Sequence, residues 1–283
     1  MEDPDQRGLH EPLHIEFLHG IAAASHRLGY HLSVALTAPG ETFEQARRIL
    51  REGRADGMIL SFGGVESNRD ALRSLATEGA PIVLMQEWES VPGVFCVSAQ
   101  DDLGAGAAAE HLIRLGHRKL AFVCGEPLWP GPRRRREGIL RAAQAAQIEV
   151  IDWWCPAFTV EAARERVRPE LGQDDAPTAI LAANDVIAMG VIQQARELGL
   201  EVPRDLSVIG FNDFDFASWI VPPLTTVRIP GAEMGERAVE LLFAAVEHER
   251  APESVAFQAE LVVRATTARP PIKTTPRRVG LPT

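Results

Sequence analysis

Polar and aromatic side chains follow several apolar, strand-like segments of this sequence at the points where those segments end. In open α/β sheets ligands bind at the carboxyl ends of parallel strands, so chemistry is expected at these positions. Asn and Asp groups exchange hydrogen bonds with hydroxyl groups, and indole rings cover the C–H face of a sugar. The set predicts a site for a small polyhydroxylated ligand. Its members are Ser61, Gln86, Glu87, Trp129, Asn184, Asn212 and Asp213, with Trp219 as a further stacking ring.

Two of these residues also have a purely structural interpretation. Asn184 stands directly before a helical pattern, where its side chain could do no more than cap the helix. Asp213 could do no more than fix a turn. The residue types by themselves leave both interpretations open.

The only dense basic run in the chain is Arg133 to Arg136. Successive residues of a helix point about 100° apart, so only one or two of these arginines can face inward. We interpret the run as a mostly solvated helix start with one arginine turned inward. There it could bind an anion or a hydroxyl group.

The patterns of common enzyme sites are absent from the sequence. It contains no Gly-x-Ser-x-Gly, no Walker A loop and no His-Glu-x-x-His. Gly104 to Ala109 resembles a dinucleotide-binding glycine pattern, but Asp101 and Asp102 stand at the helix start just ahead of it and would repel a phosphate. We therefore read Gly104 to Ala109 as small residues for helix packing, and we predict no catalysis and no cofactor.

Metal ligation is not predicted either. His10 and His14 could share a helix face, but no third ligand accompanies them. Cys96, Cys124 and Cys155 lie far apart and are odd in number, which argues against a disulfide framework and against a zinc site. We expect three buried thiols.

Composition places the chain among globular proteins without a membrane partner. Its 283 residues are 46% hydrophobic and 24% charged, and the net charge of −10 disfavours contact with nucleic acid outside a segregated basic patch. No apolar run approaches the roughly 18 residues of a membrane span. The opening Met1 to Asp5 lacks the basic and apolar regions of a signal peptide, so we expect a cytoplasmic protein.

Helical and strand-like periods alternate along the chain, which predicts an α/β fold with parallel sheets in two similar halves. Gly29 is expected to end the first helix in the left-handed conformation, and Thr42 with Gln45 matches a capping box. The expected helices are 13–28, 42–53, 67–79, 101–115, 133–147, 160–171, 185–198 and 232–247, and the expected strands are 30–37, 57–62, 81–86, 94–98, 119–124, 149–154, 178–182, 206–211, 225–229 and 255–264.

Four segments taken together resemble the effector-binding core of the lactose/galactose-repressor family of bacterial transcription regulators. They are Leu112 to Ala121 (LIRLGHRKLA), Ala182 to Gly190 (AANDVIAMG), Val202 to Phe211 (VPRDLSVIGF) and Pro223 to Arg228 (PLTTVR). The resemblance extends over residues 11 to 268. It implies a periplasmic-binding-protein-like fold of two Rossmann-like lobes, with a small effector in the cleft between them.

The resemblance also implies the lobe boundaries. The N-terminal lobe would comprise 1–117 and 225–252, and the C-terminal lobe 118–224 and 253–268. The proline-rich tail, 269–283, is expected to be disordered. The family's first strand and its helix-turn-helix module, which would precede this sequence, are not part of it.

Individual site residues carry over from the family pattern. Arg135 stands three residues before Gly138, as the family's ligand-contacting arginine does, and Asn184 matches the Asn of an Asn-Asp motif. Leu13 and His14 stand where the family often has two phenylalanines. Asn212 replaces the first Asp of a Gly-Tyr/Phe-Asp-Asp motif, and Asp213 keeps the second.

The function implied by this resemblance is ligand sensing in a transcription regulator, with no catalysis. The expected partners are a small effector, most simply a carbohydrate, and a second copy of the chain in a homodimer. Operator DNA would be bound only through an upstream helix-turn-helix module. The alternative is a soluble sugar receptor of a transport system, which has the same fold.

Overall fold

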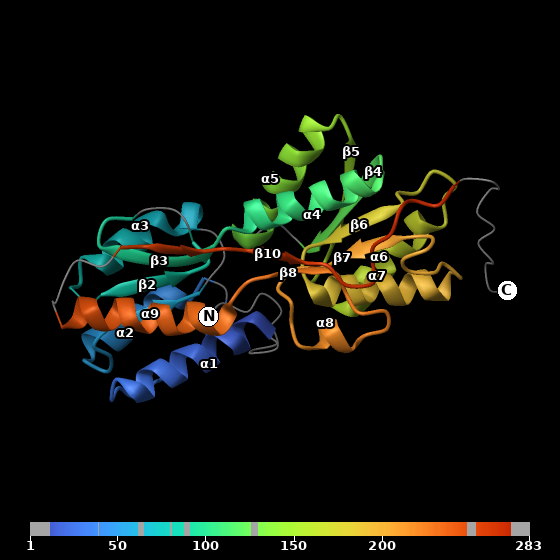
Figure 1. Ribbon diagram of the computed structural model, residues 1–283. Coiled ribbons are helices and arrows are strands. Elements are labelled where there is room, and N and C mark those ends of the chain that lie inside the picture. Colours follow the sequence, from blue (N-terminus) through green and yellow to red (C-terminus); the bar gives the residue numbers. More distant parts are fainter. Residues whose placement is uncertain are drawn as a thin grey trace. The chain divides into compact units, whose positions relative to one another are not determined.

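The computed structural model describes residues 12–38, 40–61, 65–79, 81–87, 91–125, 130–247 and 253–272 (Figure 1). The chain divides into two compact units. Unit 1 comprises Met1–Gln100, Leu128–Gly131 and Pro230–Gln258, and unit 2 comprises Asp101–Pro127, Pro132–Ile229 and Ala259–Thr283.

The unit boundaries differ from the lobe boundaries expected from the sequence. Helix α4 (Asp101–Leu115) was expected in the N-terminal lobe, but it belongs to unit 2. The reason is packing, because α4 contacts strands β6 (Ala179–Ala182), β8 (Thr226–Arg228) and β10 (Glu260–Val262) of that unit. The chain therefore passes from unit 1 to unit 2 before α4.

Unit 1 is built on a four-stranded parallel sheet in the order β1-β2-β3-β9. Helix α9 contacts β1, β2 and β3, and α1 lies on α9. The strands are β1 (Met58–Leu60), β2 (Ile82–Met85), β3 (Val94–Ala99) and β9 (Val255–Phe257), and the helices are α1 (Pro12–Arg27), α2 (Thr42–Arg51), α3 (Val65–Ala76) and α9 (Gly231–Val246).

Glycines allow α1 and α9 to approach closely. A Cβ on Gly20 would overlap the carbonyl oxygen of Ala232, and a Cβ on Gly235 would overlap that of Phe17. Helix α1 ends as predicted, since Gly29 has φ 78° and follows the last turn. Unit 1 thus uses small residues to bring one helix against the helix that covers its sheet.

Unit 2 contains a second four-stranded parallel sheet, in the order β5-β4-β6-β7, and an antiparallel ribbon of β8 and β10. Helices α6 and α7 contact each other, and α7 contacts β6 and β7. The remaining elements are β4 (Lys119–Gly125), α5 (Pro130–Ala145), β5 (Glu149–Cys155), α6 (Val160–Leu171), α7 (Asp185–Glu197), β7 (Ser207–Ile209) and α8 (Phe216–Trp219).

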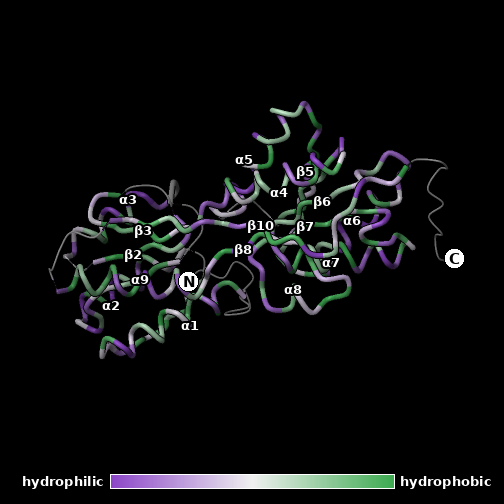
Figure 2. Tube along the Cα trace, in the orientation of Figure 1, coloured by the Kyte–Doolittle hydropathy of each residue, from purple (hydrophilic) through white to green (hydrophobic). Residues whose placement is uncertain are grey.

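Each unit has its own hydrophobic core. In unit 1 the core includes Leu72, Ile82 and Leu84, and in unit 2 it includes Ile180 and Val191. Figure 2 shows hydrophobic residues along the sheet strands and mixed colours along the helices, as expected for strands that are covered on both faces.

One predicted strand is not formed. Residues 30–36 are extended but join no ladder among the described residues, and only Thr37 forms a single bridge. Leu32, Val34 and Leu36, which alternate along this segment, are 43%, 48% and 49% exposed. Alternation gave the segment strand character, whereas a ladder also requires regular pairing with a second strand, and among the described residues no ladder includes 30–36.

Another predicted strand is divided in two. The expected strand 255–264 consists of β9, which pairs with β3 in unit 1, and β10, which pairs with β8 in unit 2. The division lies between Gln258 and Ala259, where the chain passes from one unit to the other. A continuous apolar pattern gave no sign of this change of sheet.

Two local predictions also need correction. Thr42 is the first residue of α2 and not its cap, and its hydroxyl lies 2.7 Å from that of Thr37. The short helix α8 was not predicted, because four residues are too few to show a helical period. Of the tail, 269–272 has no regular structure, and 273–283 lies outside the described residues.

Cys96, Cys124 and Cys155 are buried free thiols, as predicted. Burial raises the pKa of Cys96 to about 11, of Cys124 to about 12 and of Cys155 to about 11. In the described part of the chain, no helix combines the length and apolar character needed to cross a membrane.

Candidate functional site

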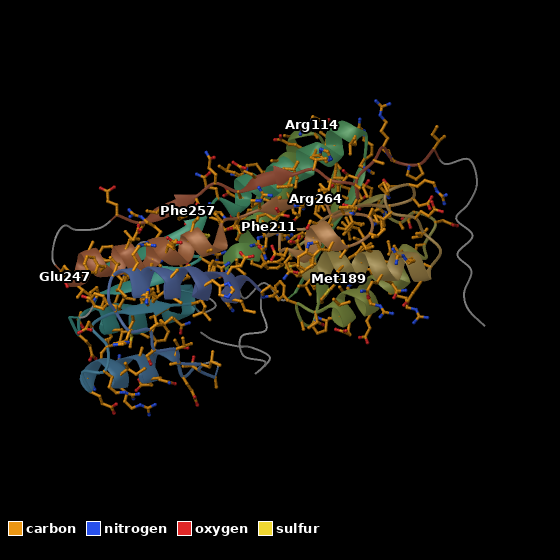
Figure 3. The ribbon with its side chains drawn as sticks, turned by 60° about the horizontal axis from the view of Figure 1, so that its bottom comes forward. Arg114, Met189, Phe211, Glu247, Phe257 and Arg264 are labelled. Carbon is orange, nitrogen blue, oxygen red and sulfur yellow. The ribbon has the colours of Figure 1, made fainter. Side chains whose placement is uncertain are left out.

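Arg135 is the buried centre of a polar cluster in unit 2. Its side chain is 4% exposed and reaches the ends of three elements. Its Nε donates to Asp101 Oδ1 at 2.6 Å, one terminal nitrogen donates to the carbonyl of Ala183 at 2.5 Å, and the other donates to Asn212 Oδ1 at 3.2 Å. Its guanidinium also lies 3.8 Å from the centre of the Phe211 ring, which Figure 3 labels.

The other arginines of the run lie nearer the surface. Arg133 is exposed, Arg134 pairs with Asp102 at 3.0 Å, and Arg136 pairs with Asp152 at 2.6 Å. The prediction that one arginine of the four turns inward is therefore confirmed. Helix α5 can bring this arginine close to α4 because a Cβ on Gly138 would overlap the backbone of α4.

Asp101 is the buried counter-charge of Arg135. Its side chain is 2% exposed. Burial raises the pKa of Asp101, and the Arg135 guanidinium opposes that rise. Sequence reasoning assigned Asp101 only to the positive end of the helix dipole, and an Asp thirty-four positions from an arginine gave no sign that the two would meet.

Asn184 caps helix α7. It is 2% exposed, and its side-chain oxygen accepts from the amide of Ile187 at 2.9 Å. The predicted capping role of this residue is confirmed, and its ligand-binding role stays a prediction. Ala183, directly before it, is the residue whose carbonyl accepts from Arg135, so the capped helix start lies at the same strand end as the arginine.

Asn212 and Asp213 form a turn of unusual backbone geometry. Their φ angles are 104° and 62°, a region that Asn and Asp enter more readily than most residues. The Asp213 carboxylate, 4% exposed, is paired with Arg228 at 2.7 Å and with Arg264 at 2.6 Å. Asp213 therefore fixes the turn, as its structural interpretation predicted.

Asp185 is a buried acid that sequence reasoning missed as part of the site. Its carboxylate accepts from the hydroxyl of Thr226 at 2.5 Å and from the amide of Phe214 at 2.9 Å. Burial raises the pKa of Asp185 to about 7. The sequence feature that could have identified Asp185 is its position directly after the capping Asn184. An acid is favoured at a helix start, and here it also accepts from the amide of Phe214 in a neighbouring turn.

Unit 1 brings together three of the predicted residues. Leu13 and His14, in the first turn of α1, are 4% and 8% exposed, and Ser61 at the end of β1 is 5% exposed. Ser61 Oγ lies 3.3 Å from His14 Nε2. These three residues form a small buried cluster within unit 1.

Of the two predicted tryptophans, the structure describes one. Trp129 lies outside the described residues. Trp219 belongs to α8 and is 73% exposed, so its ring faces solvent. A stacking role for either ring stays a prediction.

Gly104 acts in packing. A Cβ there would lie 2.6 Å from the Cβ of Ala259 and 2.8 Å from Val227 Cγ1, so the residue lets α4 approach β8 and the start of β10. The packing interpretation of Gly104 to Ala109 is confirmed for this residue. Over the residues that the structure describes, no group of three or more His, Cys, Asp or Glu side chains could hold a metal ion.

Comparison with known proteins shows which family the chain belongs to. A model described as a periplasmic binding protein-like domain matches residues 109–267, more than half of the chain. The regulator MalR of Streptomyces coelicolor is 31% identical, over 93% of this chain and 79% of MalR. The structure of a LacI family regulator from Enterococcus faecium with bound ribose has a TM-score of 0.82 and 26% identity, covering 95% of this chain and 97% of that one. The chain belongs to the LacI family.

A second relative agrees with this assignment. The HTH-type transcriptional repressor PurR of Mannheimia succiniciproducens is 30% identical, over 91% of this LacI-family chain and 78% of PurR. The α/β periplasmic-binding-protein-like fold predicted from the sequence is confirmed. Both relatives are named as transcription regulators, which supports a ligand-sensing regulator core for this chain.

Proposed function

We propose that this LacI-family core senses a small neutral carbohydrate held by Arg135, Asn184 and Asn212. The observation that carries the proposal is the bonding of Arg135. Three of its five N–H groups are used within unit 2, so two remain for a ligand. Its positive charge is already balanced by buried Asp101, which favours a neutral hydroxyl group over an anion.

The neighbouring groups suit the same ligand class. The amide groups of Asn184 and Asn212 both donate and accept, as a sugar hydroxyl requires. On this proposal Leu13, His14 and Ser61 of unit 1 form a second wall of the site. Trp129 or Trp219 stacks on the sugar's apolar face. The bound ribose in the Enterococcus faecium relative supports a carbohydrate as the ligand class.

The proposed response is a change in the arrangement of the two units. A ligand that contacts both units stabilises one arrangement over another by its difference in affinity for the two. In the proposed complete regulator, a homodimer transmits this change to operator DNA through a helix-turn-helix module. The relatives' description as HTH-type regulators supports this view.

Calorimetry against a panel of mono- and disaccharides tests the ligand class. We expect one sugar to bind, and binding of a nucleoside or amino acid with no sugar binding would overturn the proposal. Arg135→Lys keeps a cation beside Asp101 but loses the planar fork, so we expect binding weaker by roughly 10- to 100-fold. Arg136→Lys, on the same helix but paired with Asp152, should bind as the wild type does.

Asn184 allows its two roles to be separated. Asn184→Ser keeps an acceptor for the amide of Ile187, since Ser is also a good N-cap residue, but it removes the amide group that would contact a ligand. We expect nearly unchanged stability and weaker sugar binding. Unchanged binding would remove Asn184 from the proposed site.

The proposed homodimer has support on the surface of unit 2. Trp219 and Val221 are 73% and 74% exposed, and large apolar side chains that are exposed close together often mark an association surface. Sedimentation equilibrium at tens of micromolar should give twice the 30.9 kDa chain mass. Trp219→Ser should weaken the association, whereas loss of sugar binding alone would assign the ring to the ligand.

A further inference from the structure

The turn 212–214 lies between Arg135 and strand β8. The side chain of Asn212 accepts from Arg135 at 3.2 Å. The backbone of the same residue bonds in the other direction, because its amide donates to the carbonyl of Val227 at 2.7 Å and its carbonyl accepts from the amide of Ile229 at 3.5 Å. One residue therefore contacts the proposed ligand-binding arginine and both sides of Arg228.

Asp213 holds the same turn to both strands of the ribbon. Its carboxylate accepts from Nε of Arg228, the last residue of β8, at 2.8 Å. Its other oxygen lies 2.6 Å from the guanidinium of Arg264, two residues after β10; Arg264 is labelled in Figure 3. Asp213 is thus the common partner of two arginines from two strands.

The third residue of the turn is held by the start of α7. The amide of Phe214 donates to Asp185, and Thr226 of β8 donates to the same carboxylate. Thr226, Val227 and Arg228 are therefore each bonded either to the turn or to the acid that holds it. Since Asn212 and Asp213 both have positive φ, this bonding maintains a backbone geometry that most residues avoid.

The ribbon strands are the segments next to which the chain changes unit. It leaves unit 2 after Ile229, one residue beyond β8, and it re-enters unit 2 at Ala259, one residue before β10. A group that fixes both strands therefore acts on two of the chain's passages between the units. The same turn that Asp213 ties to these strands also carries Asn212, which contacts Arg135.

We propose that Asp213 is a positioning residue of the ligand response: it ties the turn 212–214 to β8 and β10, so that a change at the contact between Arg135 and Asn212 reaches the strands where the chain changes unit. In this role Asp213 acts through Arg228 and Arg264, which pair with its carboxylate, and not by touching the ligand. This inference rests on the proposed function for the identity of Arg135 as a ligand-binding residue, while its test also works without ligand.

Hydrogen exchange of the full chain, followed by mass spectrometry on peptides covering 225–230 and 259–264, tests the coupling without ligand. Arg135→Lys disturbs the contact at Asn212 from a different helix. We expect it to accelerate exchange at 225–230 by at least about threefold. In an Asp213→Asn background, where Asn still suits positive φ, the same change should have no further effect.

Two controls make the result specific. Asp205→Asn also removes a carboxylate paired with an arginine in unit 2, but away from the turn, so Arg135→Lys should keep its full effect in that background. Arg136→Lys should leave exchange at 225–230 unchanged. If Arg135→Lys leaves this peptide unchanged, or acts equally with and without the Asp213 carboxylate, the proposed coupling is wrong.

A ligand arm distinguishes positioning from ligand contact and from simple structural support. With D-ribose, or the first sugar of the panel that binds, Asp213→Asn should keep the wild-type Kd within about threefold while losing the ligand-induced change at 225–230. A Kd weaker by tenfold or more would make Asp213 a ligand contact. A preserved ligand-induced change would make it only structural. If no sugar binds, the proposed function fails, and the ligand-free arm still decides the coupling.

Discussion

The two units are built on similar parallel sheets but place their charged groups differently. In unit 2, the paired side chains of Asp101 and Arg135 are 2% and 4% exposed, and Asp213 is buried between two arginines. In unit 1, the pairs that Glu78 forms are half-buried to exposed: Arg47 with Glu78 at 20% and 18% exposed, and Arg51 with Glu78 at 68% and 18%. Unit 2 therefore has a polar interior scaffold at its strand ends.

This difference bears on how each unit should respond to substitution. An exposed ion pair contributes little to stability and tolerates replacement, whereas a buried charge must keep its partner and its geometry. The family model matches 109–267, which is drawn mostly from unit 2. The contrast predicts that the stability of unit 2 depends on single buried polar residues, whereas the stability of unit 1 depends mainly on packing.

Asp101→Ala should have the largest effect. It leaves the Arg135 guanidinium buried without its counter-charge, so we expect a loss of about 3 to 5 kcal/mol in the free energy of unfolding. Urea denaturation followed by circular dichroism measures the loss. The matched variant in unit 1 is Glu78→Ala, which removes the half-buried partner of Arg47 and of exposed Arg51 and should shift the midpoint clearly less. Equal losses in the two variants would contradict the comparison.

Glycine substitution tests the packing that the two units have in common. Gly20 in unit 1 and Gly138 in unit 2 each touch the backbone of a facing helix, so Ala at either position should cost about 1 to 3 kcal/mol through overpacking. Gly172→Ala is the control, because its neighbours stand at least 3.8 Å away and its φ is −77°. A cost in one unit only would show that the helix contacts are not equivalent.

Asp185 should make the stability of unit 2 depend on pH. Its folded pKa of about 7 lies above its unfolded value of about 4, so between these values the folded state binds a proton that the unfolded state releases. Stability from this group is therefore lost as pH rises through that window. From pH 5.5 to 7, the wild type should lose roughly 1 to 2 kcal/mol relative to Asp185→Asn. A pH-independent difference between the two proteins would show that Asp185 does not titrate there.

The sequence predicted the elements of unit 2 better than those of unit 1. The helix at 160–171 was predicted to the residue, and the strand at 119–124 was one residue short. That strand, β4, pairs with β5 along its whole length, so its predicted strand character is matched by a partner strand. The segment 30–36 in unit 1 shows what sequence patterns leave out. Its residues alternate as a strand would, but whether a strand forms depends on pairing with another strand, which the pattern does not contain.

The candidate site was predicted only at the level of residue type. The family resemblance, through the position of Arg135 relative to Gly138, selected this residue from four arginines, and the structure buries it. Its partners Asp101 and Asn212 lie 34 and 77 positions away, and sequence periodicity carries no information on contacts at that range. For the same reason the arginines that occupy Asp213 were not foreseen. Long-range charge pairing is set by topology, which a single sequence specifies only coarsely.

The smallest expected effect concerns helix capping. Thr159 caps α6 in unit 2, where its hydroxyl accepts from the amide of Ala162 at 3.2 Å, whereas Glu41 before α2 in unit 1 makes no such bond. Thr159→Ala should therefore cost about 1 kcal/mol, and Thr159→Ser should restore most of it. Glu41→Ala should leave the urea midpoint unchanged. The first amides of a helix have no partner within the helix, so a side-chain acceptor at the helix start adds one local hydrogen bond. Comparing Thr159→Ala with Glu41→Ala therefore measures that one bond, separately from the buried ion pairs of unit 2. A measurable loss for Glu41→Ala would mean that unit 1 also depends on a polar group at this helix start.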